Sequence, residues 1–522
     1  MKAFLMHPAR HFDVRRELPH HEPMLRQDLG LAVLTSVMAD GDEFVLDIAR
    51  KALLQAFDND LETILYRQAI WCDSVAHPDA MRRMYALTLE AIEGKKKSHW
   101  SFYGNYPSSI LHGSIDVLHI FMDVLTRMKS LADLHAGQVA SPGLKALFAM
   151  LRDEFSEAYF AEIHAHLGEL KFRGGLWLSA RLGPGNEGLD YILRRPSANQ
   201  PRLLLQRLLG RGRPSYTFRI GERDEAGARA VAVLRDRGIN GVANALAQSM
   251  DHMLGFFETL RAELAFYIGC LNLHDRLKLI GAPATLPRPC AAGSGNFQAE
   301  GLYDPCLALS MGHGIVGNGF AAGPRRLVII TGANQGGKSS FLRAIGLAQM
   351  MTQSGMFVAA ETYVAELCTG LFTHFKREED ASLTSGRLDE ELARVSVIAD
   401  EVSPNGMLLF NESFASTNER EGAEIARQIV SALKDRHIRV WFVTHLYAFA
   451  RGMYEGGSGD AMFLRAERLA DGTRTFRLIE GEPLETSYGE DLYREVFENA
   501  ACTSTERAAV VGHVQFVEPS GS

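Results

Sequence analysis

The stretch that decides the fold is LVIITGANQGGKSS, residues 327–340, which is followed directly by FLRAIGLAQMM. The apolar run before the first glycine predicts a buried strand over 327–332, and the residues after Lys338 predict a helix. A strand, a glycine loop with the spacing GxxxxGK[ST] and a helix, in this order, are typical of a phosphate-binding loop, since glycine lets backbone N–H groups turn toward an anion at the helix start. We therefore expect this loop to hold a nucleotide.

Two side chains of the loop have expected roles. Lys338 would reach the β and γ phosphate oxygens, and the hydroxyl of Ser339 would bind Mg²⁺. The sequence thus predicts ATP and Mg²⁺ as cofactors, and the alternative is a plain glycine turn between buried elements. The expected nucleotide-binding residues of the loop are Gly332, Ala333, Asn334, Gln335, Gly336, Gly337, Lys338, Ser339 and Ser340.

A second part of such a site is a buried strand that ends in acidic residues. The stretch MLLFNE, 407–412, is this strand, but it carries Asn411 where an aspartate is usual. Asn411 can hold a water ligand of Mg²⁺ through its carbonyl without adding negative charge, and Glu412 can polarise the attacking water. Ser339, Asn411 and Glu412 are the predicted metal-site residues, in part through water. The alternative is an acidic side chain that only caps the next turn.

Further candidates follow in order along the chain. Ser385 and Gly386 precede a helical run, so a hydroxyl and free N–H groups at the helix start could bind a γ-phosphate. His445 follows the apolar run RVWFVT, 439–444, and could contact the same phosphate. A simple helix cap and a structural histidine are the alternatives. Lys338, Glu412 and His445 are the predicted catalytic residues.

Length and composition limit the class of protein. A chain of 522 residues predicts two to four domains. The net charge of −8 argues against binding nucleic acid through overall charge but leaves room for local basic patches. The six cysteines show no zinc-ligand spacing. No apolar stretch approaches a membrane span and the N-terminus does not look like a signal peptide, so we expect a cytoplasmic protein without a membrane partner.

The chain changes character along its length, and the predicted fold class is α + α/β. Helix-period patterns dominate 24–290, apart from a strand-containing insert at about 171–223, and a Gly/Pro-rich linker is expected at 281–296. A P-loop domain of the ABC type with a mostly parallel sheet is expected over 291–500, ending in a hairpin at 461–481 that turns at Asp471-Gly472. Residues 1–23 and 501–522 are expected to be terminal segments.

Taken together, these motifs resemble the ATPase domain of the MutS family of DNA mismatch-repair proteins. The resemblance is carried by TGANQGGKSSFLR, LTSGR, LLFNESFASTNEREG, FVTHLYAFA and the trailing Ser487-Tyr488-Gly489, over roughly 300–500. Residues 24–280 fit the core, lever and clamp region of the family less closely. Only 23 residues precede this helical part, so we expect no mismatch-reading domain.

The resemblance implies roles for particular residues. Asn411 and Glu412 would form the Walker B site, and Ser385 with Gly386 would form a signature that contacts ATP of the partner subunit in a homodimer. The segment 315–318 would approach the adenine, and His445 would be the switch histidine. The departure from aspartate at Asn411 predicts slow hydrolysis.

Nucleic-acid contacts could come from basic and aromatic clusters. One cluster contains Lys95, Lys96, Lys97, His99 and Trp100; the other contains Arg202, Arg207, Arg211, Arg213, Arg219 and Arg223 near Tyr216 and Phe218. Solvated surfaces are the alternative.

The first hypothesis is a dimeric ATPase that moves a clamp on DNA. The second is a nucleotide-gated protein scaffold with slow or no turnover, and a transporter subunit is disfavoured because the helical region precedes the P-loop.

Overall fold

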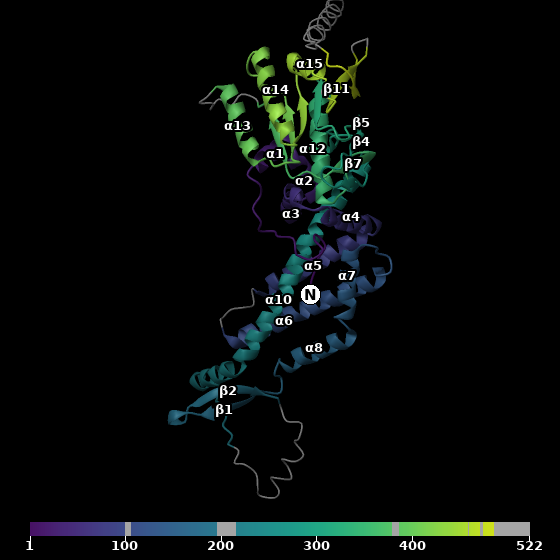
Figure 1. The fold of residues 1–522 in the computed structure, drawn as a ribbon. Helices are drawn as coiled ribbons and strands as arrows, with labels where there is room; N and C mark the ends of the chain where they lie inside the picture. The colour runs from purple at the N-terminus through teal and green to yellow at the C-terminus, as the bar shows by residue number, and fades with distance from the viewer. Residues whose placement is uncertain (100–105, 196–215, 378–385, 458, 470–472, 485–522) are drawn as a thin grey trace, which may run out of the picture. The chain divides into compact units, whose positions relative to one another are not determined.

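The computed structural model describes residues 1–99, 106–195, 216–377, 386–457, 459–469 and 473–484 (Figure 1). Packing divides the chain into two compact units, each built from separate segments of sequence. The helical unit comprises Met1–Phe12 and Cys72–Ala265, and the P-loop unit comprises Asp13–Trp71 and Phe266–Ser522.

The P-loop unit is built around a six-stranded sheet with the strand order β12-β11-β6-β10-β9-β8. All pairings are parallel except that of the edge strand β12, which runs antiparallel to β11. The mostly parallel sheet predicted from the sequence is therefore confirmed. Its strands are β6 (Leu327–Thr331), β8 (Leu371–Phe375), β9 (Met407–Asn411), β10 (Arg439–Val443), β11 (Ala461–Arg468) and β12 (Arg474–Glu480).

Helices cover both faces of the central strands, which explains why these strands are buried along almost their whole length. On one face Ile329 and Phe410 belong to a buried cluster with residues of α13, α14 and α15. Side chains alternate along a strand, so Val328 and Leu409 point to the other face. There α12 packs against Leu409 so closely that a Cβ at Gly346 would lie 2.8 Å from its side chain. The helices are α12 (Lys338–Ser354), α13 (Arg387–Glu401), α14 (Glu419–Asp435) and α15 (Tyr447–Glu455) (Figure 1).

A second sheet of the same unit has the strand order β3-β7-β4-β5. Its strands, with one short helix between them, are β3 (Arg288–Cys290), β4 (Phe297–Leu302), α11 (Pro305–Met311), β5 (Asn318–Ala321) and β7 (Thr362–Glu366). The expected linker at 281–296 is therefore only partly a linker, because β3 lies inside it and pairs with β7. Pro289 in β3 is buried. Its missing N–H is tolerated because β3 is an edge strand.

Helices from the N-terminal part of the sequence pack against α11, α12 and β8 of this unit. They are α1 (Glu22–Asp28), α2 (Leu31–Ala39), α3 (Glu43–Leu54), the 3₁₀ turn η1 (Ala56–Asp58) and α4 (Leu61–Ala76). The Asn59 amide donates to the carbonyl of Gln353 at 2.9 Å, and Arg67 donates to the carbonyl of Ser354 at 3.3 Å. The P-loop unit therefore takes in residues 13–71, which lie outside the 291–500 range expected from the sequence.

The helical unit consists mainly of long helices and carries one two-stranded hairpin. Its elements are α5 (Pro78–His99), α6 (Pro107–His135), α7 (Pro142–Asp153), α8 (Glu157–Glu169), β1 (Trp177–Leu182), β2 (Gly188–Arg194) and α10 (Glu225–Leu279), whose last residues belong to the P-loop unit. The hairpin falls in the predicted insert. Within the described residues of the same insert, Tyr216 and Phe218 are not in a strand, and both side chains are exposed.

One helix of this unit bears on the expectation that no segment is long and apolar enough to span a membrane. In the described part of the chain, α6 meets that test of length and composition. Half of its most apolar window is buried inside the protein. The core helix of a protein that has no membrane segment passes the same test, so α6 is weak evidence for a membrane.

Candidate nucleotide-binding site

The glycine loop between β6 and α12 has a conformation that its glycines permit. Gly332 and Gly337 have φ angles of 117° and 86°, which side chains rarely allow. The loop also lies close to β11, because a Cβ at Gly332 would be 2.8 Å from the backbone nitrogen of Ala466. The first N–H groups of α12 are left without helical partners, as at every helix start, and such groups bind anions. The predicted strand, loop and helix are therefore all present.

Lys338 is the first residue of α12 and is almost fully buried, at 4% exposure. Its Nζ donates to the carbonyl oxygens of Gly332 and Ala333 at 2.7 and 2.9 Å. Burial lowers the pKa of the Lys338 amine to about 8, and the nearby carboxylate of Glu412 opposes this shift. A desolvated cation inside a glycine loop gains strongly from an anionic ligand.

Ser339 is held against the end of the neighbouring strand. Its hydroxyl donates a 2.9 Å hydrogen bond to Oδ1 of Asn411, the last residue of β9. Glu412 follows with a φ of 55°, and its N–H donates to the carbonyl of Val443 in β10. A hydroxyl, an amide carbonyl and a carboxylate are oxygen ligands of the kind that Mg²⁺ prefers, so these residues fit the predicted metal.

Glu412 also contacts the predicted switch histidine. His445 Nε2 lies 3.2 Å from Oε1 of Glu412 and 3.4 Å from Nζ of Lys338. The hydrogen bond from His445 is the main cause that lowers the pKa of the Glu412 carboxyl, and burial opposes it. Glu412 is consequently a carboxylate at neutral pH, able to accept a proton or to orient a water. The structure thus brings together Lys338, Ser339, Asn411, Glu412 and His445.

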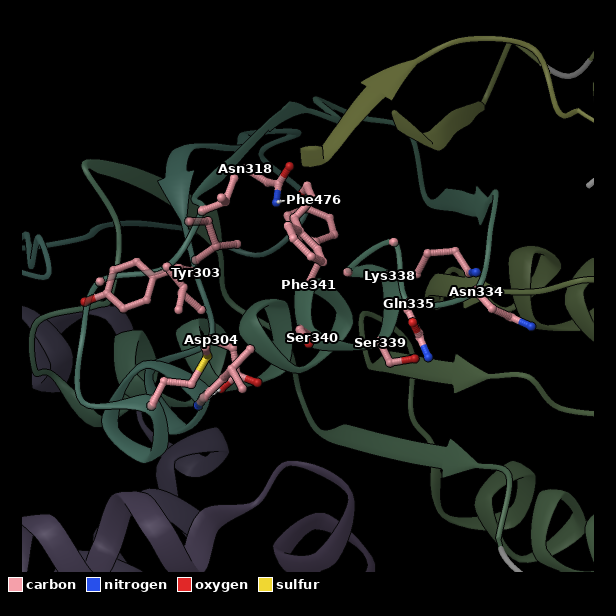
Figure 2. Close-up of a pocket in the computed structure, with 18 of the residues that line it drawn as sticks. Tyr303, Asp304, Asn318, Asn334, Gln335, Lys338, Ser339, Ser340, Phe341 and Phe476 are labelled. Atoms are coloured by element: carbon pink, nitrogen blue, oxygen red, sulfur yellow. Dashed lines mark hydrogen bonds between the residues drawn. The ribbon is translucent and has the colours of Figure 1, made fainter. Parts of the chain in front are cut away.

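Of these residues, Lys338, Ser339 and Glu412 border a pocket of about 490 Å³ that continues away from the loop (Figure 2). The segment predicted to approach the adenine contributes Ile315, Val316 and Asn318, whereas Gly317 is not among the lining residues. Sequence reasoning missed the remainder of this wall. It is formed by Leu302, Tyr303, Asp304, Leu307, Met311, His313, Gly314, Phe341 and Phe476. An apolar wall next to a polar loop suits a ligand with a planar base and a phosphate chain.

Phe476 is placed in this pocket by hydrogen bonds between the side chain of Asn318 and the backbone of β12. Its carbonyl accepts from the Asn318 amide at 3.1 Å, and the N–H of Leu478 donates to the Asn318 side-chain oxygen at 2.7 Å. Arg474, on the same strand, donates to the side-chain oxygen of Gln335 in the glycine loop at 2.5 Å. The hairpin β11–β12 is therefore part of the pocket wall.

Other predicted residues are not brought to the pocket by the structure or lie outside its description. Ser385, Trp100, Arg202, Arg207, Arg211, Arg213, the turn Asp471-Gly472 and the segment Ser487-Tyr488-Gly489 are outside the described residues, as is the side chain of His99. Gly386 is described and is the N-cap of α13. In the basic cluster of α5, Lys95 pairs with Asp251 and Lys97 with Glu93, so part of the positive charge of this cluster is compensated.

The loop, the buried lysine and the strand-end polar residues on a mostly parallel sheet define a P-loop protein. Comparison with known families identifies which one. The family described as MutS2 N-terminal domain matches residues 59–280, and the family described as MutS domain V matches residues 328–498. The chain is therefore a MutS-related protein, and the resemblance predicted from its motifs is confirmed.

Individual relatives agree with this assignment. The Endonuclease MutS2 of Thermus thermophilus is 27% identical over 259 residues, 49% of this chain and 33% of the relative. The DNA mismatch repair protein MutS of Thermus aquaticus is 33% identical over 121 residues, 23% of this chain and 15% of the relative. An Endonuclease MutS2 of Streptococcus pyogenes is 31% identical over 163 residues, 30% of this chain and 20% of the relative. The matched part thus spans a third or less of the length of these relatives.

Proposed function

We propose that this chain is an ATPase that works as a homodimer and couples the binding and hydrolysis of ATP to a movement on DNA. The observation that carries the proposal is the set of contacts among Lys338, Ser339, Asn411, Glu412 and His445. Lys338, Ser339 and Glu412 of this set line one pocket. Its polar end suits phosphates and its apolar end suits a base. The MutS-related families to which the chain is similar support the extension from nucleotide to DNA.

The described side chains divide the work of hydrolysis. Lys338 would exchange the carbonyls of Gly332 and Ala333 for phosphate oxygens, and Ser339 with Asn411 would hold the metal ion. Mg²⁺ supplies positive charge that neutralises the phosphate chain. Glu412 accepts a hydrogen bond from the attacking water and orients it. His445, hydrogen-bonded to Glu412, holds this carboxylate in place and can contact the γ-phosphate as a donor.

Turnover by the full chain tests the enzymatic part of the proposal. We expect Mg²⁺-dependent release of phosphate from ATP that is lost in Lys338→Ala and in Glu412→Gln. Lys145→Ala is a matched control because Lys145 is exposed on α7 of the helical unit. Undiminished turnover in both site variants would place the activity elsewhere in the chain or in a contaminant.

The shared site of a dimer is tested by mixing two inactive variants. If Ser385 of one subunit completes the site built on Lys338 of the other, Lys338→Ala and Ser385→Ala are each inactive alone. An equal mixture then recovers about a quarter of the wild-type turnover, because half of the dimers are mixed and each of these has one intact site. No recovery in a mixture that still dimerises would contradict the shared site.

Stimulation of ATP turnover by DNA tests the proposed coupling to DNA. Turnover should rise with duplex or branched DNA, and the rise should shrink with added salt as counterion release weakens binding.

A second candidate function is a nucleotide-gated scaffold for protein partners with little turnover. It is favoured by Asn411, which leaves the metal site one negative charge short of an aspartate. ATP-dependent dimerisation without turnover or DNA binding would support that alternative.

A further inference from the structure

A second pocket lies in the helical unit and is lined by residues of the end of α8, the turn after it and the β1–β2 hairpin. Figure 1 shows these elements. It has a volume of about 660 Å³, which is within the range of sites for small ligands. It is lined by His166, Gly168, Glu169, Leu170, Phe172, Arg173, Gly174, Gly175, Trp177, Leu193, Arg194 and Arg195. We call it the hairpin pocket. Its lining combines guanidinium groups with aromatic rings, unlike a pocket that is only a packing defect.

Positive charge dominates the hairpin pocket. Three arginines line it and Glu169 is its one carboxylate. Glu169 lies 3.6 Å from Arg195, and both side chains are largely exposed, so this pair is weak. Arg194 donates to the hydroxyl of Ser179 at 2.6 Å, which orients its guanidinium without neutralising it. Arg173 makes no ion pair with any residue that the structure describes. The pocket therefore attracts an anion.

The aromatic part of the pocket is open to solvent. Trp177, the first residue of β1, is 53% exposed, which is unusual for so large an apolar side chain. It follows a tight turn in which the N–H of Gly175 donates to the carbonyl of Phe172. Phe172 has a φ of 49°, a conformation that is uncommon for an aromatic residue. Gly174 and Gly175 have no atom within 4 Å of the place where a Cβ would stand, so the backbone leaves space beside the indole.

We propose that the hairpin pocket binds an unpaired nucleotide of a DNA strand, with the base stacked on Trp177 and the flanking phosphates at Arg173 and Arg195. This proposal rests on the proposed DNA-binding function and names the form of DNA that this surface reads. An exposed indole offers a π-face to any base, and stacking needs a base that is not already inside a duplex. Guanidinium groups around it supply phosphate contacts in the same way as in other single-strand grooves.

The concave shape favours an unpaired nucleotide over a duplex. A duplex touches a protein through its outward phosphates and its groove edges, and its base faces are covered. Exposed arginines on a flat or convex face would serve that purpose, and no partly open tryptophan would be needed. A pocket with one aromatic face and cations at its rim instead matches a base with its own phosphate.

Binding of fluorescent oligonucleotides to the full chain tests the proposal. The probes are an oligothymidine strand, a blunt duplex, a duplex with a single-stranded tail, and an RNA strand of matched length. We expect the oligothymidine and the tailed duplex to bind more tightly than the blunt duplex. Trp177→Leu should weaken both single-strand probes by roughly tenfold and leave the blunt duplex within about twofold. Trp177→Phe, which keeps an aromatic face, should restore most of the loss.

The salt dependence of the affinity tests the arginines of the hairpin pocket. Arg173→Ala should reduce the slope of log affinity against log salt by about 0.7 for the oligothymidine, the loss of one phosphate contact on a single strand. Arg181→Ala is the matched control because Arg181 lies on the same strand β1, outside the pocket, and pairs with Asp190. A thermal unfolding curve like that of the wild type checks that each variant is folded, since these residues belong to the helical unit whereas ATP turnover reports on the P-loop unit.

The outcomes separate this proposal from the proposed function. Failure of the wild-type chain to bind any DNA probe would overturn both. DNA-stimulated turnover with equal affinity of wild type and Trp177→Leu for every probe would overturn only the hairpin pocket. Tighter binding of the RNA strand than of the oligothymidine would overturn the assignment to DNA.

Discussion

The hydroxyl of Ser339 donates a 2.9 Å hydrogen bond to the side-chain oxygen of Asn411. This bond joins the first turn of α12 to the end of β9, the two elements that carry the phosphate loop and Glu412. An aspartate at 411 would accept the same bond and add one negative charge. Asn411 therefore keeps the geometry of the site and changes its electrostatics, which leads to the first prediction.

Asn411→Asp should lower the Mg²⁺ concentration that gives half-maximal ATP turnover by about tenfold, because a full charge within a few ångströms of the ion strengthens its binding by about 1.4 kcal/mol in a partly exposed site. Turnover measured over a titration of MgCl₂ checks this. Ser339→Ala should shift the same curve to higher Mg²⁺. Superimposable curves for Asn411→Asp and wild type would show that the amide is already an adequate ligand.

Nucleotide affinity should depend on pH through Lys338. Its amine has a pKa of about 8 in the structure, so it is cationic below that pH and loses its charge above it. A bound phosphate raises this pKa, so binding takes up a proton above pH 8 and affinity falls as pH rises, at most tenfold per pH unit. Calorimetric titration with ADP between pH 7 and 10 measures the effect. Lys338→Arg, which stays charged, should flatten the curve; an equally steep curve in this variant would assign the dependence to another group.

Substitutions in the pocket wall should weaken ATP binding without lowering the maximal rate of hydrolysis. Phe476→Ala should weaken ATP binding by roughly tenfold through loss of an aromatic face, while the maximal turnover stays within about twofold. Asn318→Ala should act in the same direction, because it removes the hydrogen bonds that hold the backbone of residues 476 and 478. KM and kcat measured separately decide the matter. Leu469→Ala, an exposed residue of the same hairpin, is the control.

His374 predicts an acid-sensitive fold. It is fully buried in β8, its Nδ1 lies 2.6 Å from the Ser413 hydroxyl, and burial followed by repulsion from Arg394 lowers its pKa to about 3. The native state keeps this ring neutral while the unfolded chain protonates it near pH 6.5, so its contribution to stability is lost as pH falls from 6.5 toward 3. Between pH 6.5 and 5 the loss is about 2 kcal/mol at 1.36 kcal/mol per unit.

Urea unfolding of wild type and His374→Gln at pH 7 and pH 5 isolates this effect from other titrating groups. The difference in midpoint between the two pH values should be smaller in the variant, which keeps a polar side chain beside Ser413 but cannot gain a proton. Equal differences in both proteins would mean that His374 does not contribute.

The sequence predicts best what neighbouring residues dictate. The loop from Gly332 to Ser339 and the ends of β9 and β10 follow from glycine spacing and from apolar runs. They also meet in space, because parallel strands bring their carboxyl ends to the same edge of a sheet. Phe476 could not be found in this way. It lies 138 residues after Lys338 (476 − 338), and its position depends on strand pairing and on the side chain of Asn318.

Long-range packing escaped prediction for the same reason. Asn59 and Arg67 bond to the carbonyls at the end of α12, so an N-terminal segment completes the P-loop unit. The local sequence pattern of residues 13–71 does not indicate that this segment packs against the end of α12. The hairpin pocket was also missed, because the turn between Phe172 and Gly175 positions Trp177 only once β1 and β2 have paired.

Asn318 has one more consequence. β12 is the edge strand of the six-stranded sheet, and its outward N–H and C=O groups could pair with a strand of another molecule. The Asn318 amide occupies such groups at Phe476 and Leu478, in the manner of a single residue of a further strand. The same amide therefore shapes the nucleotide pocket and discourages edge-to-edge aggregation. Loss of solubility and loss of nucleotide affinity should accompany each other in any variant that frays β12.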